Sequence, residues 1–114
     1  MIRFTLPEHP STNALYTNDP GKGRVKTGEY KSWINEAGCS LKEQKVKPIA
    51  PGWYRLFISI SQRSGLDLDS VKAIPDLLQR HGIITNDKLA KRIEIDRDAA
   101  VPEGMVWVGL ESVP

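Results

Sequence analysis

The chain has too little cysteine to form a disulfide or a metal site built from thiolates. Cys39 is the single cysteine among 114 residues, so an intramolecular disulfide and a cysteine-based zinc cage are both excluded. A chain that lacks disulfides is typical of the reducing environment inside cells. The sequence therefore predicts a cytoplasmic protein that is stabilised by an apolar core.

Long apolar runs are also absent. No segment approaches the run of about 18 apolar residues that a transmembrane helix needs, and the N-terminal MIRFTLPEHP lacks the apolar centre of a signal peptide. Hydrophobic residues make up 39% of the chain and charged residues 26%, a balance typical of globular proteins. We expect one domain over residues 1–114 and no membrane partner.

Several common catalytic and nucleotide-binding patterns are missing too. The chain contains neither GxGxxG nor GxxxxGK[ST], so no phosphate-cradling loop is predicted. His9 and His81 do not have the spacing of a metal-binding pair, and Cys39 has no histidine near it in the sequence. Carboxylates and basic residues are therefore the main candidates for chemistry.

Charge is segregated along the chain, although the net charge is only +2. Basic residues predominate between Lys22 and Lys47, and the carboxylates gather later, at Asp67, Asp69, Asp76, Asp87, Glu94, Asp96 and Asp98. A basic half beside an acidic cluster fits a polyanion held near bound cations. The alternative explanation is a solvated helix face followed by acidic residues in ordinary loops, which fits the same pattern.

Apolar periodicity predicts two helices. The first begins after Thr27 as its N-cap, with Gly38 as a candidate early end, and its apolar face is Tyr30, Trp33, Ile34, Ala37 and Leu41. The second spans Val71 to Gln79, capped by Asp69 or Ser70, with a first turn bent by Pro75 and with Gly82 in a left-handed conformation after it.

Alternation of apolar and polar residues predicts four strands, over Met1–Leu6, Trp53–Ser61, Arg92–Arg97 and Met105–Ser112. Residues 99–104 are expected to join the last two strands as a hairpin, and residues 7–27 to form a long loop. All three tryptophans, Trp33, Trp53 and Trp107, are expected in the core. The prediction is an α+β fold in which two helices pack on one face of a small mixed sheet.

The stretch GLDLDSVK contains the strongest chemical signal. Asp67 and Asp69 are two positions apart, so on an extended segment both carboxylates point to one side, where they repel each other unless a cation lies between them. Asp87 follows the second predicted helix, which can bring it back toward the pair. Three converging carboxylates are a ligand set that Mg²⁺ or Mn²⁺ prefers, and Lys72 could neutralise charge on a phosphate during hydrolysis.

Each of these residues also has a simpler explanation. An aspartate before a helix is most often a cap, Lys72 fits a solvated surface position, and Asp87 in TNDK fits a plain turn. A structural calcium loop is a further alternative, but the glycine and the distal glutamate of an EF-hand loop are missing.

The N-terminal string TLPEHPSTNALYTNDPGKGRVKTGEYKSW resembles the opening of the RusA family of Holliday-junction resolvases. That family begins with a strand, a proline-rich LP…PSxNxxY loop, a basic tip and a helix that contains tyrosine. The matching residues are Leu6, Pro7, Pro10, Ser11, Asn13, Tyr16, Arg24, Lys26 and Tyr30.

A second string, DLDSVKAIPDLLQRHGIITND, resembles the family's later motif. The family pattern there is Asp-x-Asp-Asn-x-x-Lys, followed by an Asp-x-Leu helix, a glycine and an acidic pair. The matching residues are Asp67, Asp69, Lys72, Asp76, Leu78, Gly82 and Asp87. The two matches lie in the family's order and together cover nearly the whole chain.

The resemblance implies a Mg²⁺-dependent endodeoxyribonuclease that acts in DNA recombination and repair. Family members are homodimers that bind four-way junctions and nick two strands symmetrically, with Mg²⁺ (or Mn²⁺ as a substitute) on three aspartates. Those are Asp67, Asp69 and Asp87 here, with Lys72 as the fourth catalytic residue. The DNA-binding residues that the resemblance implies are Asn13, Tyr16, Lys22, Arg24, Lys26 and Lys31.

Three departures from the family pattern define an alternative. Ser70 replaces the family's asparagine, Asn86 replaces the first residue of the late acidic pair, and the spacing from Asp69 to Lys72 is one residue short. A one-residue deletion keeps both aspartates aligned, whereas anchoring on Lys72 places leucines there instead. The alternative is a catalytically weakened RusA-like protein that binds branched DNA without cutting it.

Overall fold

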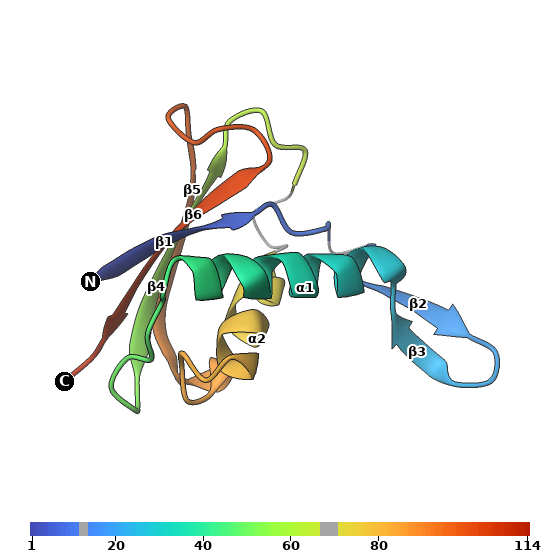
Figure 1. The fold of residues 1–114 in the computed structure, drawn as a ribbon, viewed down its shortest axis with the longest axis horizontal. Helices are drawn as coiled ribbons and strands as arrows, with labels where there is room; N and C mark the ends of the chain where they lie inside the picture. Colours follow the sequence, from blue (N-terminus) through green and yellow to red (C-terminus); the bar gives the residue numbers. More distant parts are fainter. Residues whose placement is uncertain (12–13, 67–70) are drawn as a thin grey trace.

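A four-stranded sheet, a separate hairpin and two α-helices make up the part of the chain that the computed structural model describes, residues 1–11, 14–66 and 71–114. The elements, in order, are β1 (Ile2–Pro7), β2 (Tyr16–Asp19), β3 (Gly23–Lys26), α1 (Gly28–Glu43), β4 (Tyr54–Ser61), α2 (Ala73–Arg80), the 3-10 helix η3 (Asp87–Leu89), β5 (Ala90–Asp98) and β6 (Met105–Ser112) (Figure 1). Within these described ranges no helix is long and apolar enough to cross a membrane.

The main sheet is mixed, as the sequence predicted, but its strand order was not foreseen. The order is β1-β6-β4-β5, in which β6 is antiparallel to both its neighbours and β5 is parallel to β4. The expected hairpin over residues 99–104 is therefore wrong, because β4 lies between β5 and β6. Parallel strands need a long crossover, and the segment that contains α2 supplies it between β4 and β5.

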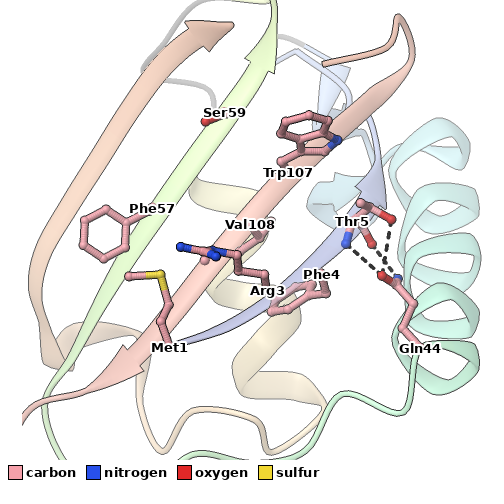
Figure 2. A pocket seen from close by; sticks show the side chains of 10 residues that line it. Met1, Arg3, Phe4, Thr5, Gln44, Phe57, Ser59, Trp107 and Val108 are labelled. Atoms are coloured by element: carbon pink, nitrogen blue, oxygen red, sulfur yellow. Dashed lines mark hydrogen bonds between the residues drawn. The ribbon is translucent and has the colours of Figure 1, made fainter. Parts of the chain in front are cut away.

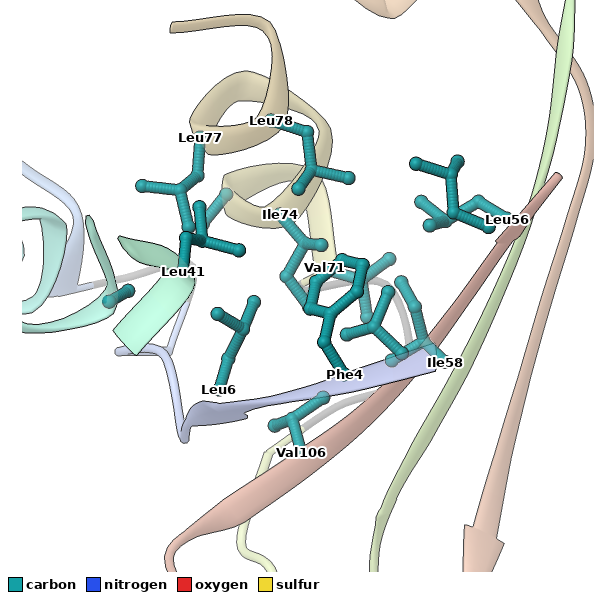
Figure 3. Close-up of a cluster of buried hydrophobic side chains, with 14 of the residues drawn as sticks. Phe4, Leu6, Leu41, Leu56, Ile58, Val71, Ile74, Leu77, Leu78 and Val106 are labelled. Atoms are coloured by element: carbon teal, nitrogen blue, oxygen red, sulfur yellow. The ribbon is translucent and has the colours of Figure 1, made fainter. Parts of the chain in front are cut away.

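Both helices pack on one face of this sheet, and the core lies between them and the strands (Figure 3). Side chains alternate in burial along β4, where Leu56, Ile58 and Ile60 are almost fully buried. The helices contribute Leu41 from α1 and, from α2, Ile74, Leu77 and Leu78. The fold is thus α+β with helices over one face of a mixed sheet, which confirms the predicted fold class at this level.

The first predicted helix is confirmed, including its cap. Thr27 has an extended conformation and its hydroxyl accepts a hydrogen bond from the Tyr30 N–H. Gly38 does not end the helix, which continues to Glu43. A Cβ atom at Gly38 would lie 2.9 Å from Nε2 of His81, so the glycine permits the close approach of the His81 ring to α1.

The second helix begins later than predicted. Its N-cap position is Lys72, which makes no side-chain capping bond. The predicted cap residues Asp69 and Ser70 lie outside the described residues. Pro75 is consequently the third residue of the helix, within the first turn, where backbone N–H groups have no intrahelical partner. Gly82 has a φ of 70°, which confirms the left-handed residue after this helix.

The predicted loop over residues 7–27 contains a hairpin that the sequence analysis missed. Strands β2 and β3 pair antiparallel, from Tyr16 opposite Lys26 to Asp19 opposite Gly23. The hairpin extends away from the main sheet at the N-terminal end of α1 (Figure 1). Each strand has only four residues, too few to show a clear apolar alternation among the surrounding prolines and glycines.

Two of the three tryptophans are not in the core. Trp33 is 4% exposed, as expected, but Trp53 is 51% and Trp107 39% exposed. Both lie on or beside strands whose alternate residues face the helices. Where one face of a strand is open to solvent, the sequence does not tell an exposed tryptophan from a buried one, because a tryptophan can lie on either face.

We predict that Thr27→Ala destabilises the protein by about 1–2 kcal/mol. The Thr27 hydroxyl caps α1 and also donates to the Ala14 carbonyl oxygen at 2.5 Å, so its loss loosens the hairpin from the helix. Urea unfolding measures the change, and Thr27→Ser, which keeps both bonds, is the matched control. Equal stability of the two variants would contradict this role of the hydroxyl.

Candidate active site

Two carboxylates meet where α2 and η3 approach each other. Asp76 lies in the first turn of α2 and Asp87 begins η3, and both side chains line one hollow. Burial, followed by the proximity and charge of Asp87, raises the pKa of Asp76, while the positive charges of Lys72 and Lys26 act in the opposite direction. A second carboxylate close by disfavours the charged form of Asp76.

The backbone of Asp87 is fixed from two sides. The Tyr54 hydroxyl, at the start of β4, donates to the Asp87 carbonyl oxygen at 2.8 Å. The Asp87 N–H donates to Oε1 of Gln79 on α2 at 2.7 Å. Asn86 then caps η3, its Oδ1 accepting from the Lys88 N–H at 2.9 Å. The sheet, the helix and the cap therefore determine together where the Asp87 carboxylate lies.

Two tyrosines beside the acids remain protonated at any physiological pH. Burial, followed by the charges of Asp87 and Asp76, raises the pKa of Tyr54 to about 12. Burial, with Tyr16 and Asp76 as further causes, raises the pKa of Tyr30 to about 12. Their hydroxyls can therefore donate hydrogen bonds at the site, but they cannot serve as bases.

A hollow of about 280 Å³ opens beside the acidic pair, between the hairpin, the two helices and η3. Its polar lining combines both charge signs with two phenols, and consists of Tyr16, Lys26, Tyr30, Asp76, Gln79, Arg80 and Asp87. Carboxylates and basic groups in one hollow suit a phosphate that is held next to a cation.

The hairpin is joined to α1 through a series of ring contacts. The Arg24 guanidinium lies 4.4 Å from the centroid of the Tyr16 ring, a cation–π contact. The Tyr16 ring meets the Tyr30 ring edge-on at 5.7 Å, and Tyr30 in turn stacks on Trp33 at 6.2 Å. The basic residues of the hairpin are thus positioned relative to the helix that borders the acids.

The donor set fits a hard divalent cation. Mg²⁺ is commonly bound through one or two carboxylates, with water in its other positions, and Asp76 and Asp87 supply two carboxylates in one hollow. Among the residues that the structure describes, no cluster of three or more His, Cys, Asp or Glu side chains occurs. The described residues therefore supply two carboxylates as candidate metal ligands.

The structure brings some of the predicted residues together, while others fall outside its description. Asp87 and Lys26 line the hollow, and Lys72 is near enough to Asp76 to affect its pKa. Tyr16 lines the hollow as well, and the side chains of Lys22, Arg24 and Lys31 are exposed on the hairpin and at the start of α1. Asp67, Asp69 and Asn13 lie outside the described residues.

Asp76 was not predicted as a site residue, although the sequence contains a signal for it. The resemblance placed it only within a helix motif. Lys72 and Asp76 are four positions apart, so a helix that begins near Lys72 presents both on one face. The three apolar residues Ile74, Leu77 and Leu78 occupy the opposite face, which leaves Asp76 facing the site.

Comparisons with known proteins give no family assignment for this chain. No protein-family model matches it, and no curated protein matches it. Arguments about its function therefore come from its own residues and from the resemblance described above.

We predict that Asp76→Asn stabilises the protein at pH 7 in the absence of divalent cations. Folding raises the pKa of Asp76, so its charged form opposes folding, and stability is lost as the pH rises from the unfolded pKa through the folded pKa. The gain is below about 1 kcal/mol, because water screens a half-buried pair.

Thermal unfolding of both proteins between about pH 3 and pH 7 measures this effect. The difference should vanish at the acid end, where Asp76 is protonated in both states. Glu103→Gln, which removes one charge from a pair that is largely exposed, is the control. A stability gain that did not change with pH would contradict an electrostatic origin.

Proposed function

We propose that the protein is a Mg²⁺-dependent, structure-selective endodeoxyribonuclease that resolves four-way DNA junctions by paired, symmetric nicks. The observation that carries the proposal is the carboxylate pair Asp76–Asp87, which lines one hollow together with Lys26 and Tyr16 of the basic hairpin. The resemblance to the RusA family supports it, because Asp87 and Lys72 are two of the residues that the resemblance implies for catalysis. A homodimer, as in that family, belongs to the proposal.

The carboxylates would hold the metal. Asp87 and Asp76 are the two described candidates, and Asp67 and Asp69 would complete the ligand set. Bound Mg²⁺ would supply an activated water and would stabilise the negative charge of the attacked phosphodiester.

The chain's own cations and phenols would position the scissile phosphate. Lys26 lines the hollow with Asp76 and Asp87, and the charges of Lys26 and Lys72 oppose the rise in the pKa of Asp76, so a phosphate oxygen beside the carboxylates would meet positive charge. Gln79 and Tyr54 act through Asp87: they hold its backbone, and so they are positioning residues.

The hairpin would bind the DNA backbone. Lys22 and Arg24 are exposed, and Arg24 lies on the Tyr16 ring, so a phosphate could contact the guanidinium while the ring holds it in place. Lys31, one turn into α1, extends the same basic surface toward the helix. Contacts of this kind position DNA without reading its sequence, which suits a ligand recognised by its branched shape.

We predict that the protein nicks a synthetic mobile four-way junction in Mg²⁺, that it leaves linear duplex uncut, and that EDTA abolishes the cutting. Asp87→Asn and Asp69→Asn should lower the cleavage rate by about 100-fold or more, because each removes a charge that holds the cation. Junction binding should survive in both variants and could be compared by gel shift without Mg²⁺.

The matched control is Glu103→Gln, which removes one carboxylate from the exposed pair with Arg63; neither residue lines the hollow beside Asp76 and Asp87. It should cut at the wild-type rate. Tight junction binding with no cutting in either Mg²⁺ or Mn²⁺ would overturn the nuclease proposal and leave the alternative, a protein that binds branched DNA without cleaving it.

We further predict that replacing Lys22 and Arg24 together by alanine weakens junction binding and makes its salt dependence shallower. A plot of log affinity against log salt should lose about 2 from its slope, close to one per phosphate contact. Lys45→Ala with Lys47→Ala, two exposed lysines beyond the other end of α1, is the control. An equal loss of slope in both double variants would contradict a specific role for the hairpin.

A further inference from the structure

An exposed tryptophan and a lysine lie together at the end of the sheet where β4 begins. Trp53 is 51% exposed, and the Lys91 ammonium, on the edge strand β5, lies 5.8 Å from the centroid of its ring. A single exposed tryptophan is ordinary on a protein surface. What distinguishes Trp53 is the cation beside its ring, since a flat apolar face next to a positive charge matches the two parts of a nucleotide.

A bulge in β5 brings Lys91 to the ring. Ala90 lies opposite Tyr54 on β4, and the next paired residue is Arg92, opposite Arg55. Lys91 is therefore an extra residue without a partner on β4, and bulges of this kind redirect side chains. Within the described ranges Lys91 takes part in no ion pair, so its charge is available to a ligand.

The backbone of Trp53 is fixed on both sides. Gly52, just before it, has a φ of 116°, a conformation that favours glycine. The Trp53 carbonyl oxygen accepts a hydrogen bond from the Val113 N–H at 2.9 Å, just beyond β6. A ring on a fixed backbone loses little conformational freedom when a flat ligand stacks on it.

The ring and the acidic site share their supports. Tyr54 follows Trp53 in the chain, and its hydroxyl holds the Asp87 carbonyl oxygen at 2.8 Å. Lys91 lies four positions after Asp87, where η3 passes into β5. Neighbouring residues of an extended chain point to opposite sides, so Tyr54 points toward the acids and Trp53 away from them, at the rim of the same end of the sheet.

We propose that Trp53 and Lys91 form a stacking site for an unpaired DNA base close to the phosphate that is cut. The ring would take a base of any identity, and the ammonium would contact a phosphate of the same strand. Bases inside a linear duplex are stacked on one another, whereas those at a branch point can unstack at a lower cost. The inference rests on the proposed function and names the part of the DNA that would distinguish a junction from a duplex.

Trp107 provides the matched control. It is 39% exposed but lies on the sheet face opposite the helices, in a hollow of about 540 Å³ that Met1 and Phe57 also line (Figure 2). In the described part of the chain, the cation–π contacts are those of Tyr16 and Trp53. Trp107 therefore tests whether any exposed tryptophan would serve.

Tryptophan fluorescence reports stacking directly, and EDTA excludes cutting from the experiment. A short single-stranded oligothymidylate should quench the fluorescence of the wild type and of Trp107→Phe, whereas Trp53→Phe should lose most of the quenching. Trp33 is only 4% exposed and adds a constant background. Quenching that persists in Trp53→Phe overturns the proposal, and so does a wild type that does not bind the oligonucleotide.

The anisotropy of a labelled oligothymidylate separates the ring from the charge. Trp53→Ala should weaken binding about 5- to 150-fold, the range for one stacked base, while Trp107→Ala should bind like the wild type. Lys91→Met keeps the aliphatic stem and removes the charge, so the slope of log affinity against log salt should become shallower by about 0.7. An unchanged affinity in Trp53→Ala contradicts stacking. Thermal unfolding checks that the variants fold.

Junction DNA separates this inference from the nuclease proposal. Neither Trp53 nor Lys91 is among the described residues that line the hollow beside the acids. Trp53→Ala should bind a four-way junction less tightly and linear duplex as before, and equal losses for both would overturn the stacking site. A protein that shows the expected quenching but cuts no junction would refute the nuclease proposal only. One that cuts junctions, and binds them equally well after Trp53→Ala, would refute the stacking site only.

Discussion

The burial of α2 against the sheet is the constraint on which the proposed site depends. Ile74 and Leu78 have no measurable exposure and Leu77 only 2%, so the rotation of this short helix about its own axis is determined by its apolar side. Burying three such side chains stabilises the fold by several kcal/mol, at about 1.5–3 kcal/mol each. Asp76 therefore faces η3, because the opposite side of the helix is buried in the core.

The same helix lies in the connection between the two parallel strands, and this connection joins the buried core to the acidic pair. The chain leaves β4, passes through α2 and returns through η3 to β5 beside β4. Tyr54 begins β4 and holds Asp87 just before β5. The acidic pair thus lies where the crossover closes, and two carboxyl groups can be held close together there because strand pairing and helix burial, rather than their own interaction, hold the backbone.

The sequence predicted correctly those elements that are determined by contacts between residues close together in the chain. The prediction of helix α1 was correct from its cap to its apolar face. The cap at Thr27 and the apolar face formed by Tyr30, Trp33, Ala37 and Leu41 are both determined within a few turns of the chain. The position of β5 beside β4 depends on contacts between residues such as Ile58 and Ile95, far apart in the chain, and no local pattern encodes it. The predicted hairpin between β5 and β6 failed for that reason.

The candidate site shows the same division. Asp87 and Lys72 could be singled out from their sequence context, whereas the partnership of Asp76 with Asp87 needs α2 and η3 to be placed against each other. Lys26 became part of the site only because the residues expected as a loop form a hairpin that reaches the acids. Trp107 could not be placed from the sequence, because alternation in β6 separates two faces of the strand but does not say which face the helices cover.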